Sequence, residues 1–137
     1  MINTGPHKIQ MDKWIECAPF ERLLKMEIVD AADGRAILRM PFVSEFAQGA
    51  GVMHGGALVS LADTAMIMAI KSLVAPGTHF VTTEIQSKFI SPVRQGSVTA
   101  KAKVLRPIGS VLYGSATVFN DRERPVLDVT SVFRVKN

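Results

Sequence analysis

The sequence predicts an α+β domain in which an antiparallel β-sheet wraps around one long central helix. The chain has 137 residues, a length that suits one domain rather than two. One long apolar stretch, residues 55–75, has helical composition, and six other stretches have the character of strands. The strands are joined by short connections, which favours antiparallel neighbours over parallel crossovers.

The N-terminal part of the chain is expected to hold little regular structure. Residues 1–12 of the single domain, which spans 1–137, form a loose leader in this interpretation, because Gly5 and Pro6 disfavour a helix or strand there. Residues 11–26 carry apolar residues at spacings that predict one or two short helical turns.

The stretches 27–33 and 35–43 predict a β-hairpin. Apolar residues in the second stretch alternate with polar ones, as expected for a strand with one buried face. The dipeptide Asp33-Gly34 lies between the stretches and is a favoured hairpin turn.

Residues 55–75 predict the long helix, because the run is rich in Ala, Leu and Met and lacks the alternation of a strand. Pro76-Gly77 ends it. Apolar side chains surround nearly its whole circumference, so we expect the sheet to cover most of its sides. Four further strands are expected after it, at 79–91, 97–106, 110–120 and 125–135.

Composition excludes several classes of protein. A hydrophobic content of 47% and a charged content of 20% fit a folded domain. A net charge of +4 is consistent with an anionic ligand, but no basic run with interleaved aromatic residues and no helix-turn-helix extension favours nucleic acid. The single cysteine, Cys17, excludes an intramolecular disulfide and a cysteine-based zinc cluster.

We expect a cytoplasmic protein that does not span a membrane. The polar N-terminus does not resemble a targeting peptide, and no apolar run approaches the roughly 18 residues that a membrane helix requires. The histidines His7, His54 and His79 lack the spacing of metal ligands, so no metal site is expected.

A glycine-rich segment, residues 48–56, leads directly into the predicted long helix. Gly55 and Gly56 at a helix N-terminus would direct unpaired N–H groups outward at the positive end of the helix dipole. Such a place suits a carbonyl oxygen that gains negative charge during a reaction. The alternative is a glycine-rich turn needed only for a tight entry into the helix.

Asp63 lies in the middle of the same apolar helix, two turns after the glycines. A carboxylate among apolar residues is costly unless it is paired, hydrogen-bonded or used in chemistry. The alternative is a narrow polar stripe, formed with Ser60, Thr64 and Lys71. One helix that supplies both an oxyanion site and a carboxylate would hold the minimal groups for acyl transfer to water.

His54, immediately before the two glycines, is interpreted as a residue that orders the loop rather than as a general base. No Gly-x-Ser-x-Gly nucleophile segment is present, and no acidic residue is placed to form a triad with the histidine.

Residues 48–63, with His54-Gly55-Gly56 followed nine residues after the histidine by Asp63, resemble the hotdog-fold thioesterases. The resemblance is greatest to the PaaI-like acyl-CoA thioesterases of phenylacetate degradation. It covers roughly residues 20–136, includes Phe89-Ile-Ser-Pro92 after the helix, and implies the hotdog fold.

The resemblance also implies roles for individual residues. The Gly55 N–H would polarise the thioester carbonyl, and the Gln48 amide would assist it, although many relatives have Asn there. Asp63 would act as general base or nucleophile, and Thr82 would position the attacking water. The adjacent Thr83 leaves the choice of threonine open, since strand registers slip easily.

The family places its site between two subunits, so we expect a homodimer or a dimer of dimers. No cofactor is expected, because coenzyme A enters as part of the acyl-CoA substrate. The residues expected to contact substrate or coenzyme A are His54, Gly56, Lys88, Arg94 and Arg106. The three cations are candidates for its phosphates, the alternative being ordinary solvated charges.

The leading hypothesis is therefore hydrolysis of an acyl-CoA thioester. The alternatives are a hydratase of enoyl thioesters and a non-catalytic sensor that binds acyl-CoA. The acyl pocket is expected to be shaped by side chains such as Met53, Met66, Ile67, Met68 and Phe89.

Overall fold

The structure is a computed structural model that describes residues 1–105 and 109–136. Its elements, in chain order, are α1 (Pro19–Leu23), β1 (Glu27–Ala32), β2 (Arg35–Pro41), the 3-10 helix η1 (Ser44–Phe46), α2 (Gly55–Lys71), β3 (His79–Phe89), β4 (Ser97–Val104), β5 (Val111–Phe119) and β6 (Pro125–Lys136). The predicted order of helices and strands is confirmed.

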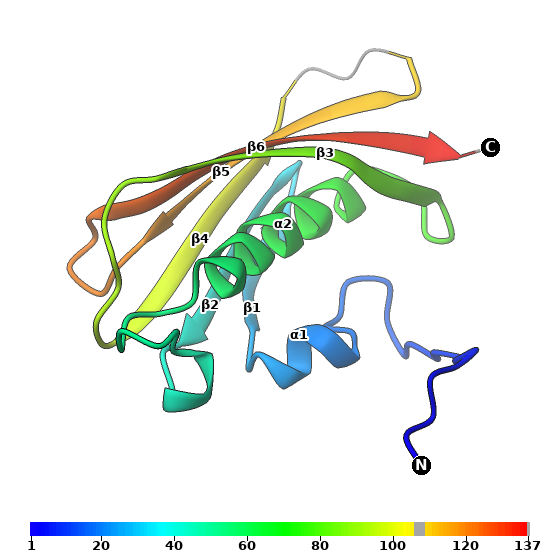
Figure 1. Cartoon of the computed structure of the whole chain (residues 1–137). Coiled ribbons are helices and arrows are strands. Elements are labelled where there is room, and N and C mark those ends of the chain that lie inside the picture. Colours follow the sequence, from blue (N-terminus) through cyan, green and yellow to red (C-terminus); the bar gives the residue numbers. More distant parts are fainter. Residues whose placement is uncertain (106–108, 137) are drawn as a thin grey trace.

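One antiparallel sheet carries the fold, with the strand order β1-β2-β4-β5-β6-β3. The sheet curves behind α2, which packs on its concave face (Figure 1). Apolar residues of α2 such as Leu61, Ala65 and Met66 meet inward-facing residues such as Leu38, Val118 and Phe133 in the core. The predicted α+β arrangement, a sheet around one long helix, is therefore confirmed.

The turn between β1 and β2 is tied to the far end of α2. Asp33 and Gly34 both have positive φ, 54° and 77°, as a tight two-residue hairpin turn requires. The Gly34 N–H donates to the Ser72 hydroxyl at 2.8 Å, and that hydroxyl donates to the Ala69 carbonyl at 2.6 Å. The helix accordingly ends at Lys71, four residues earlier than predicted.

One pairing differs from the expectation that short connections join neighbouring strands. β3 pairs with β6 at the edge of the sheet and not with β4, which follows it in the chain. Residues 90–96 cross the end of the sheet: the Ile90 N–H donates to the Val126 carbonyl of β6, and the Phe42 N–H after β2 donates to the Gly96 carbonyl. The buried side chain of Val93 anchors this crossing.

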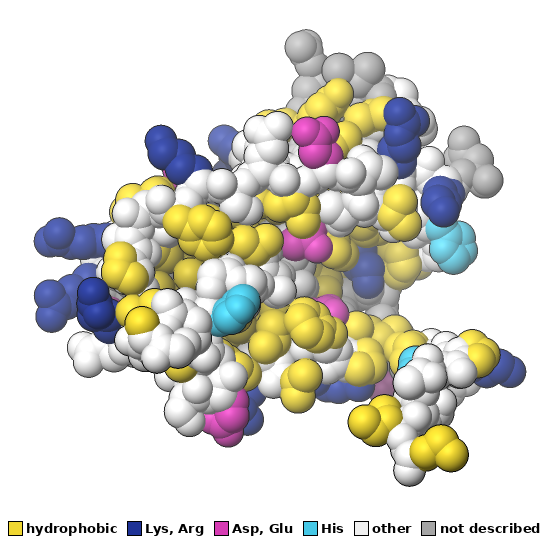
Figure 2. All heavy atoms as spheres, viewed as in Figure 1, with side chains coloured by type: hydrophobic (Ala, Val, Ile, Leu, Met, Phe, Trp, Pro, Cys, Tyr) yellow, Lys and Arg dark blue, Asp and Glu magenta, His cyan; other side chains and the backbone are white. Residues whose placement is uncertain are grey.

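Two surfaces next to each other lack a covering layer. The side of α2 away from the sheet carries Val59, Ser60, Asp63, Ile67 and Lys71, which are only half-buried, so the helix is less enclosed than its composition predicts. Hydrophobic side chains gather on this side of the molecule, over α2 and α1 (Figure 2). Edge strand β3 lies beside it and is exposed along most of its length.

No helix within the described part of the chain combines the length and apolarity that crossing a membrane would need.

Candidate active site

The glycine-rich loop before α2 is a tight turn fixed by its own backbone. The Gln48 N–H donates to the Val52 carbonyl, and the Gly51 N–H donates to the Gln48 carbonyl, each at 2.9 Å. Gly51 has a φ of 86°, which a residue without a Cβ adopts at little cost. The Met53 N–H donates to the Val93 carbonyl at 2.8 Å. The crossing segment, residues 90–96, therefore holds this loop in place.

His54 caps helix α2. Its Nδ1 accepts a hydrogen bond from the Gly56 N–H at 2.8 Å. A Cβ at position 56 would lie 2.9 Å from the His54 ring, which explains why a glycine stands there. This arrangement agrees with the interpretation of His54 as a residue that orders the loop, and it occupies the Gly56 N–H in the free chain.

Gly55 keeps a backbone donor at the start of the helix. Its N–H has no acceptor among the residues that the structure describes, and it lies at the positive end of a 17-residue helix. The Phe89 ring covers the Gly55 Cα, since a Cβ there would come within 3.0 Å of Phe89 Cε1. The contact between Gly55 and Phe89 was not predicted from the sequence, because it joins a helix to a distant strand.

Asp63 faces the open side of α2 and is half-buried. The Thr82 hydroxyl of β3 donates to its carboxylate at 3.1 Å. Desolvation raises the pKa of Asp63 above its ordinary value, the Thr82 hydrogen bond opposes this shift, and the negative charge of Glu21 adds to it. A carboxylate with a raised pKa beside a surface opening has the character of a group used in proton transfer.

A β-bulge determines which of the two adjacent threonines, Thr82 or Thr83, contacts Asp63. The register of β3 against β6 shifts between Thr82 and Glu84. Thr82 therefore turns toward Asp63, whereas the Thr83 hydroxyl donates to the Val132 carbonyl at 3.2 Å. Bulges commonly re-aim a side chain in this way.

Gly55 and Asp63 are separated along the helix. Eight residues at 1.5 Å each place them about 12 Å apart along the axis. One reacting carbonyl cannot lie within hydrogen-bond distance of both groups in a single chain.

The other predicted site residues take different positions. The Gln48 side-chain carbonyl accepts from the Ala50 N–H within the glycine loop. Arg94 is exposed on the crossing segment that holds this loop, near Gly55 in the fold. Lys88 lies opposite Asp128 of β6, on the face of the sheet turned away from α2. Arg106 lies outside the described residues.

Three of the methionine positions expected to shape the acyl pocket belong to the core instead. Met66 and Met68 on α2 are 0% and 1% exposed, and Met53 is 3% exposed. Met66 and Met68 lie on the side of α2 that faces the sheet, whereas Met53 is buried in the loop before the helix. Ile67 is half-buried and Phe89 is 56% exposed, so these two remain next to the open side.

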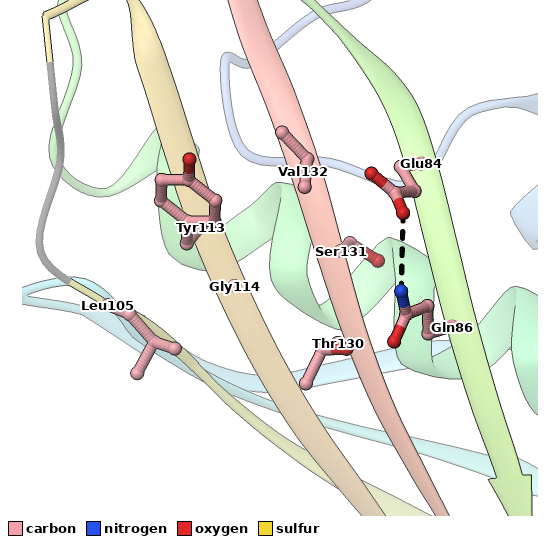
Figure 3. Close-up of a pocket in the computed structure, with 8 residues that line it drawn as sticks. All are labelled: Glu84, Gln86, Leu105, Tyr113, Gly114, Thr130, Ser131 and Val132. Atoms are coloured by element: carbon pink, nitrogen blue, oxygen red, sulfur yellow. Dashed lines mark hydrogen bonds between the residues drawn. The ribbon is translucent and has the colours of Figure 1, made fainter.

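The surface has several hollows, and only some of them are lined by predicted site residues. A hollow of about 390 Å³ lies on the outer face of β3, β6 and β5, between Tyr113 and Gln86 (Figure 3). Its polar groups include Glu84, which accepts from Gln86 at 3.2 Å, but it contains no predicted site residue. Two others adjoin the site: one of about 390 Å³ beside His54 and Gly56, and one of about 220 Å³ beside Thr82.

Within residues 1–105 and 109–136, no group of three or more His, Cys, Asp or Glu side chains is placed to hold a metal ion.

The similarity of this chain to known proteins covers the same residues. The family model of the thioesterase superfamily matches residues 50–126, more than half of the chain and a range that includes Gly55, Asp63 and Thr82. The chain belongs to the thioesterase superfamily. The predicted resemblance is therefore confirmed, and membership supports the expectation of a thioester hydrolase.

Individual relatives agree with this assignment. Acyl-coenzyme A thioesterase 13 of Homo sapiens is 30% identical over 105 residues, which are 74% of this chain and 73% of that protein. A Saccharolobus solfataricus protein with the provisional name of an esterase is 31% identical over 91 residues, which are 66% of this chain. The chain spans 64% of the length of that relative.

Solved structures share the fold of this thioesterase-superfamily chain over most of its length. A conserved protein of Pseudomonas aeruginosa has a TM-score of 0.86 and 28% identity, over 93% of this chain and 100% of its own. The E. coli PaaI protein from the phenylacetic acid degradation operon has a TM-score of 0.79, with 86% of this chain and 84% of its own covered. At 24% identity the PaaI likeness concerns the fold, which is the hotdog fold.

Proposed function

We propose that this chain hydrolyses an acyl-CoA thioester to the free acid and coenzyme A. The observation that carries the proposal is the pair of groups on helix α2: a backbone N–H at Gly55 without an acceptor among the described residues, and a half-buried Asp63 held by Thr82. A preorganised donor and a carboxylate of raised pKa are what acyl transfer to water requires. The name of the human relative, an acyl-coenzyme A thioesterase, supports this substrate class.

In the proposed reaction, the thioester carbonyl oxygen accepts a hydrogen bond from the Gly55 N–H, with the Gln48 amide assisting. Asp63 takes a proton from a water molecule positioned by Thr82, and the water oxygen attacks the acyl carbon. The carbon–sulfur bond then breaks, and the coenzyme A thiolate receives the proton. In the alternative, the Asp63 carboxylate itself attacks the acyl carbon, the carbon–sulfur bond breaks and the coenzyme A thiolate leaves, and water then hydrolyses the resulting anhydride to the free acid.

We propose a homodimer as the smallest active unit, because Gly55 and Asp63 of one chain lie too far apart to act on one carbonyl. The edge strand β3 exposes backbone groups and apolar side chains, with Val81 42% and Ile85 40% exposed. An uncovered edge of this kind is a natural pairing surface. A two-fold pairing that covers β3 and the open side of α2 would bring the Asp63 of one subunit to the Gly55 of the other. A dimer of dimers is the larger assembly consistent with this unit.

Binding of the coenzyme A phosphates is assigned to exposed cations near the glycine loop, with Arg94 the first candidate because its segment holds that loop. His54 and Gly56 shape the corner that the thioester enters. Lys88 faces away from the corner of its own chain, so a role for it requires a neighbouring subunit. Arg106 is proposed from the sequence alone.

The test is a hydrolysis assay with a panel of acyl-CoAs, in which release of the free thiol is measured for the parent and for Asp63→Asn. We expect thiol release by the parent and a loss of about 10²- to 10⁴-fold in the variant. Equal rates for parent and variant would overturn the role of Asp63. Hydration of an enoyl-CoA, or tight binding of acyl-CoA without any hydrolysis, would favour the hydratase or the sensor instead.

A further inference from the structure

We propose that the hollow beside the C-terminal half of α2 receives the acyl group, and that Trp14 closes its far end and limits the length of that group. The inference rests on the proposed function, since it names the part of the substrate that this surface would hold. Trp14 comes from the segment before α1 and is far in sequence from Asp63 and from Thr82.

The hollow begins next to the hydrogen-bond partner of the carboxylate. Thr82, which donates to Asp63, is also part of its lining. Ile67, one helical turn after Asp63, and Phe80, two strand residues before Thr82, form apolar walls on either side. A group that leaves the reacting carbon on the side of Asp63 would therefore meet apolar surface at once.

Trp14 lies where helix α2 ends. Its indole N–H donates to the Lys71 carbonyl at 3.0 Å. The Lys71 ammonium lies over the indole ring, 4.8 Å from the centroid. Two interactions with one residue thus fix the ring at the end of the hollow, and Lys71 is two helical turns, about 12 Å, beyond Asp63.

The size of the hollow sets the class of acyl group. Its volume is about 220 Å³. An apolar cavity of about 150 Å³ accepts a benzene molecule, so the hollow suits a short, branched or ring-sized acyl group. A long chain would collide with Trp14 or would have to pass Lys71 and His79, which bring polar groups to the rim.

The second hollow, beside His54 and Gly56, is the competing place for an acyl group. It is lined by Phe20 and Leu24 of the α1 region and by Phe46. Its lining does not include Thr82, the hydrogen-bond partner of Asp63. Phe20 therefore offers a matched control, an aromatic residue that borders the other hollow.

The experiment compares kcat/KM for straight-chain acyl-CoAs, from butanoyl to hexadecanoyl, among the parent, Trp14→Ala, Trp14→Phe and Phe20→Ala. We expect Trp14→Ala to raise the ratio of long-chain to short-chain kcat/KM by about tenfold, the scale of discrimination by size in an apolar pocket. Trp14→Phe keeps an aromatic wall and should keep the preference for short chains. An unchanged ratio in Trp14→Ala, or a changed ratio in Phe20→Ala instead, would overturn the inference.

A second measurement does not depend on how Trp14→Ala folds. Trp14 is the only tryptophan of the chain, so its fluorescence reports on this hollow alone. In Asp63→Asn, which should bind substrate without rapid turnover, we expect hexanoyl-CoA to change the emission and free coenzyme A to leave it unchanged. Equal responses to both ligands, in a parent that hydrolyses acyl-CoA, would overturn the inference alone. Absence of hydrolysis by the parent would instead overturn the proposed function.

Discussion

The Thr82 hydroxyl donates a hydrogen bond of 3.1 Å to the Asp63 carboxylate and so joins edge strand β3 to the open side of helix α2. The bond favours the ionised carboxylate, whereas burial and the charge of Glu21 favour the protonated one. The pKa of Asp63 is raised because desolvation is the largest of these effects.

Thr82→Val should raise the pKa of Asp63 further, because it removes the hydrogen bond that favours the ionised form. Since Asp63 acts in that form in the proposed reaction, the acid side of the profile of kcat/KM against pH should move to higher pH. Thr82→Ser keeps the hydroxyl and is the matched control, expected to leave the profile near that of the parent. Coincident profiles for Thr82→Val and the parent would contradict a role for the bond in tuning Asp63.

Asp63→Asn should raise the melting temperature at neutral pH while it removes activity. The pKa of Asp63 is higher in the folded chain than in the unfolded chain, so the folded state binds this proton more tightly. Its contribution to stability is present at low pH and is lost as the pH rises through the folded pKa. The neutral amide avoids that loss and can still accept from Thr82.

Calorimetry at equal protein concentration checks this prediction. We expect Asp63→Asn to melt a few degrees above the parent at neutral pH, where 1 kcal/mol corresponds to about 4 °C for a domain of this size. The difference should shrink in acid, where the parent carboxyl is protonated. A melting temperature below that of the parent at neutral pH would contradict the predicted cost of burying the charge.

Gly55→Pro tests the backbone donor directly. Proline lacks an N–H and is tolerated at the first position of a helix. It also requires an extended preceding residue, and His54 already has φ −59° and ψ 129°. Gly55→Ala places a Cβ against Phe89 as proline does but keeps the N–H, so it is the matched control.

We expect kcat for Gly55→Pro to fall about 10²- to 10³-fold below that of Gly55→Ala, the scale of removing one oxyanion donor. Circular dichroism and melting temperature show whether both variants keep the fold. Similar kcat values for the two would mean that the Gly55 N–H does not contact the reacting carbonyl.

The cap at the start of α2 should also be measurable. His54→Ala removes the acceptor of the Gly56 N–H and should destabilise the chain by about 1 kcal/mol, as other lost N-caps do. His54→Asn offers a capping oxygen and should recover most of that stability in urea unfolding. If His54→Ala and His54→Asn unfold at the same urea concentration, the cap contributes little to stability.

Much of the fold could be predicted because its signals are local. Alternation marked β2, the Asp33-Gly34 turn marked the hairpin, and Ala, Leu and Met marked α2. The pairing of β3 with β6 could not be predicted, because a connection as short as residues 90–96 usually joins neighbours, and here it crosses the sheet end.

Local sequence signals single out only some residues of the candidate site. The glycines and Asp63 stand out on one helix, but a helix that is apolar nearly all round does not show which face is open. The sequence therefore suggests Met66 and Met68 as pocket residues. In the structure they are buried against the sheet, on the same side of the helix as the small residues Ala62, Ala65 and Ala69. The choice between Thr82 and Thr83 depends on a bulge, which leaves no clear local pattern.

A mixture of two inactive variants should regain activity if the site lies between subunits. In a homodimer of Asp63→Asn, or of Gly55→Pro, both active sites are inactive. A mixed dimer combines both defects in one site and leaves the other with an intact Gly55 from one subunit and an intact Asp63 from its partner. With random exchange, half of the dimers are mixed and half of their sites are intact, so about a quarter of the parental activity should return.

The experiment measures thiol release before and after subunit exchange, with native mass spectrometry to confirm mixed dimers and each variant alone as control. Mixed dimers without activity would contradict a site shared between chains, because a site within one chain would stay broken in every combination.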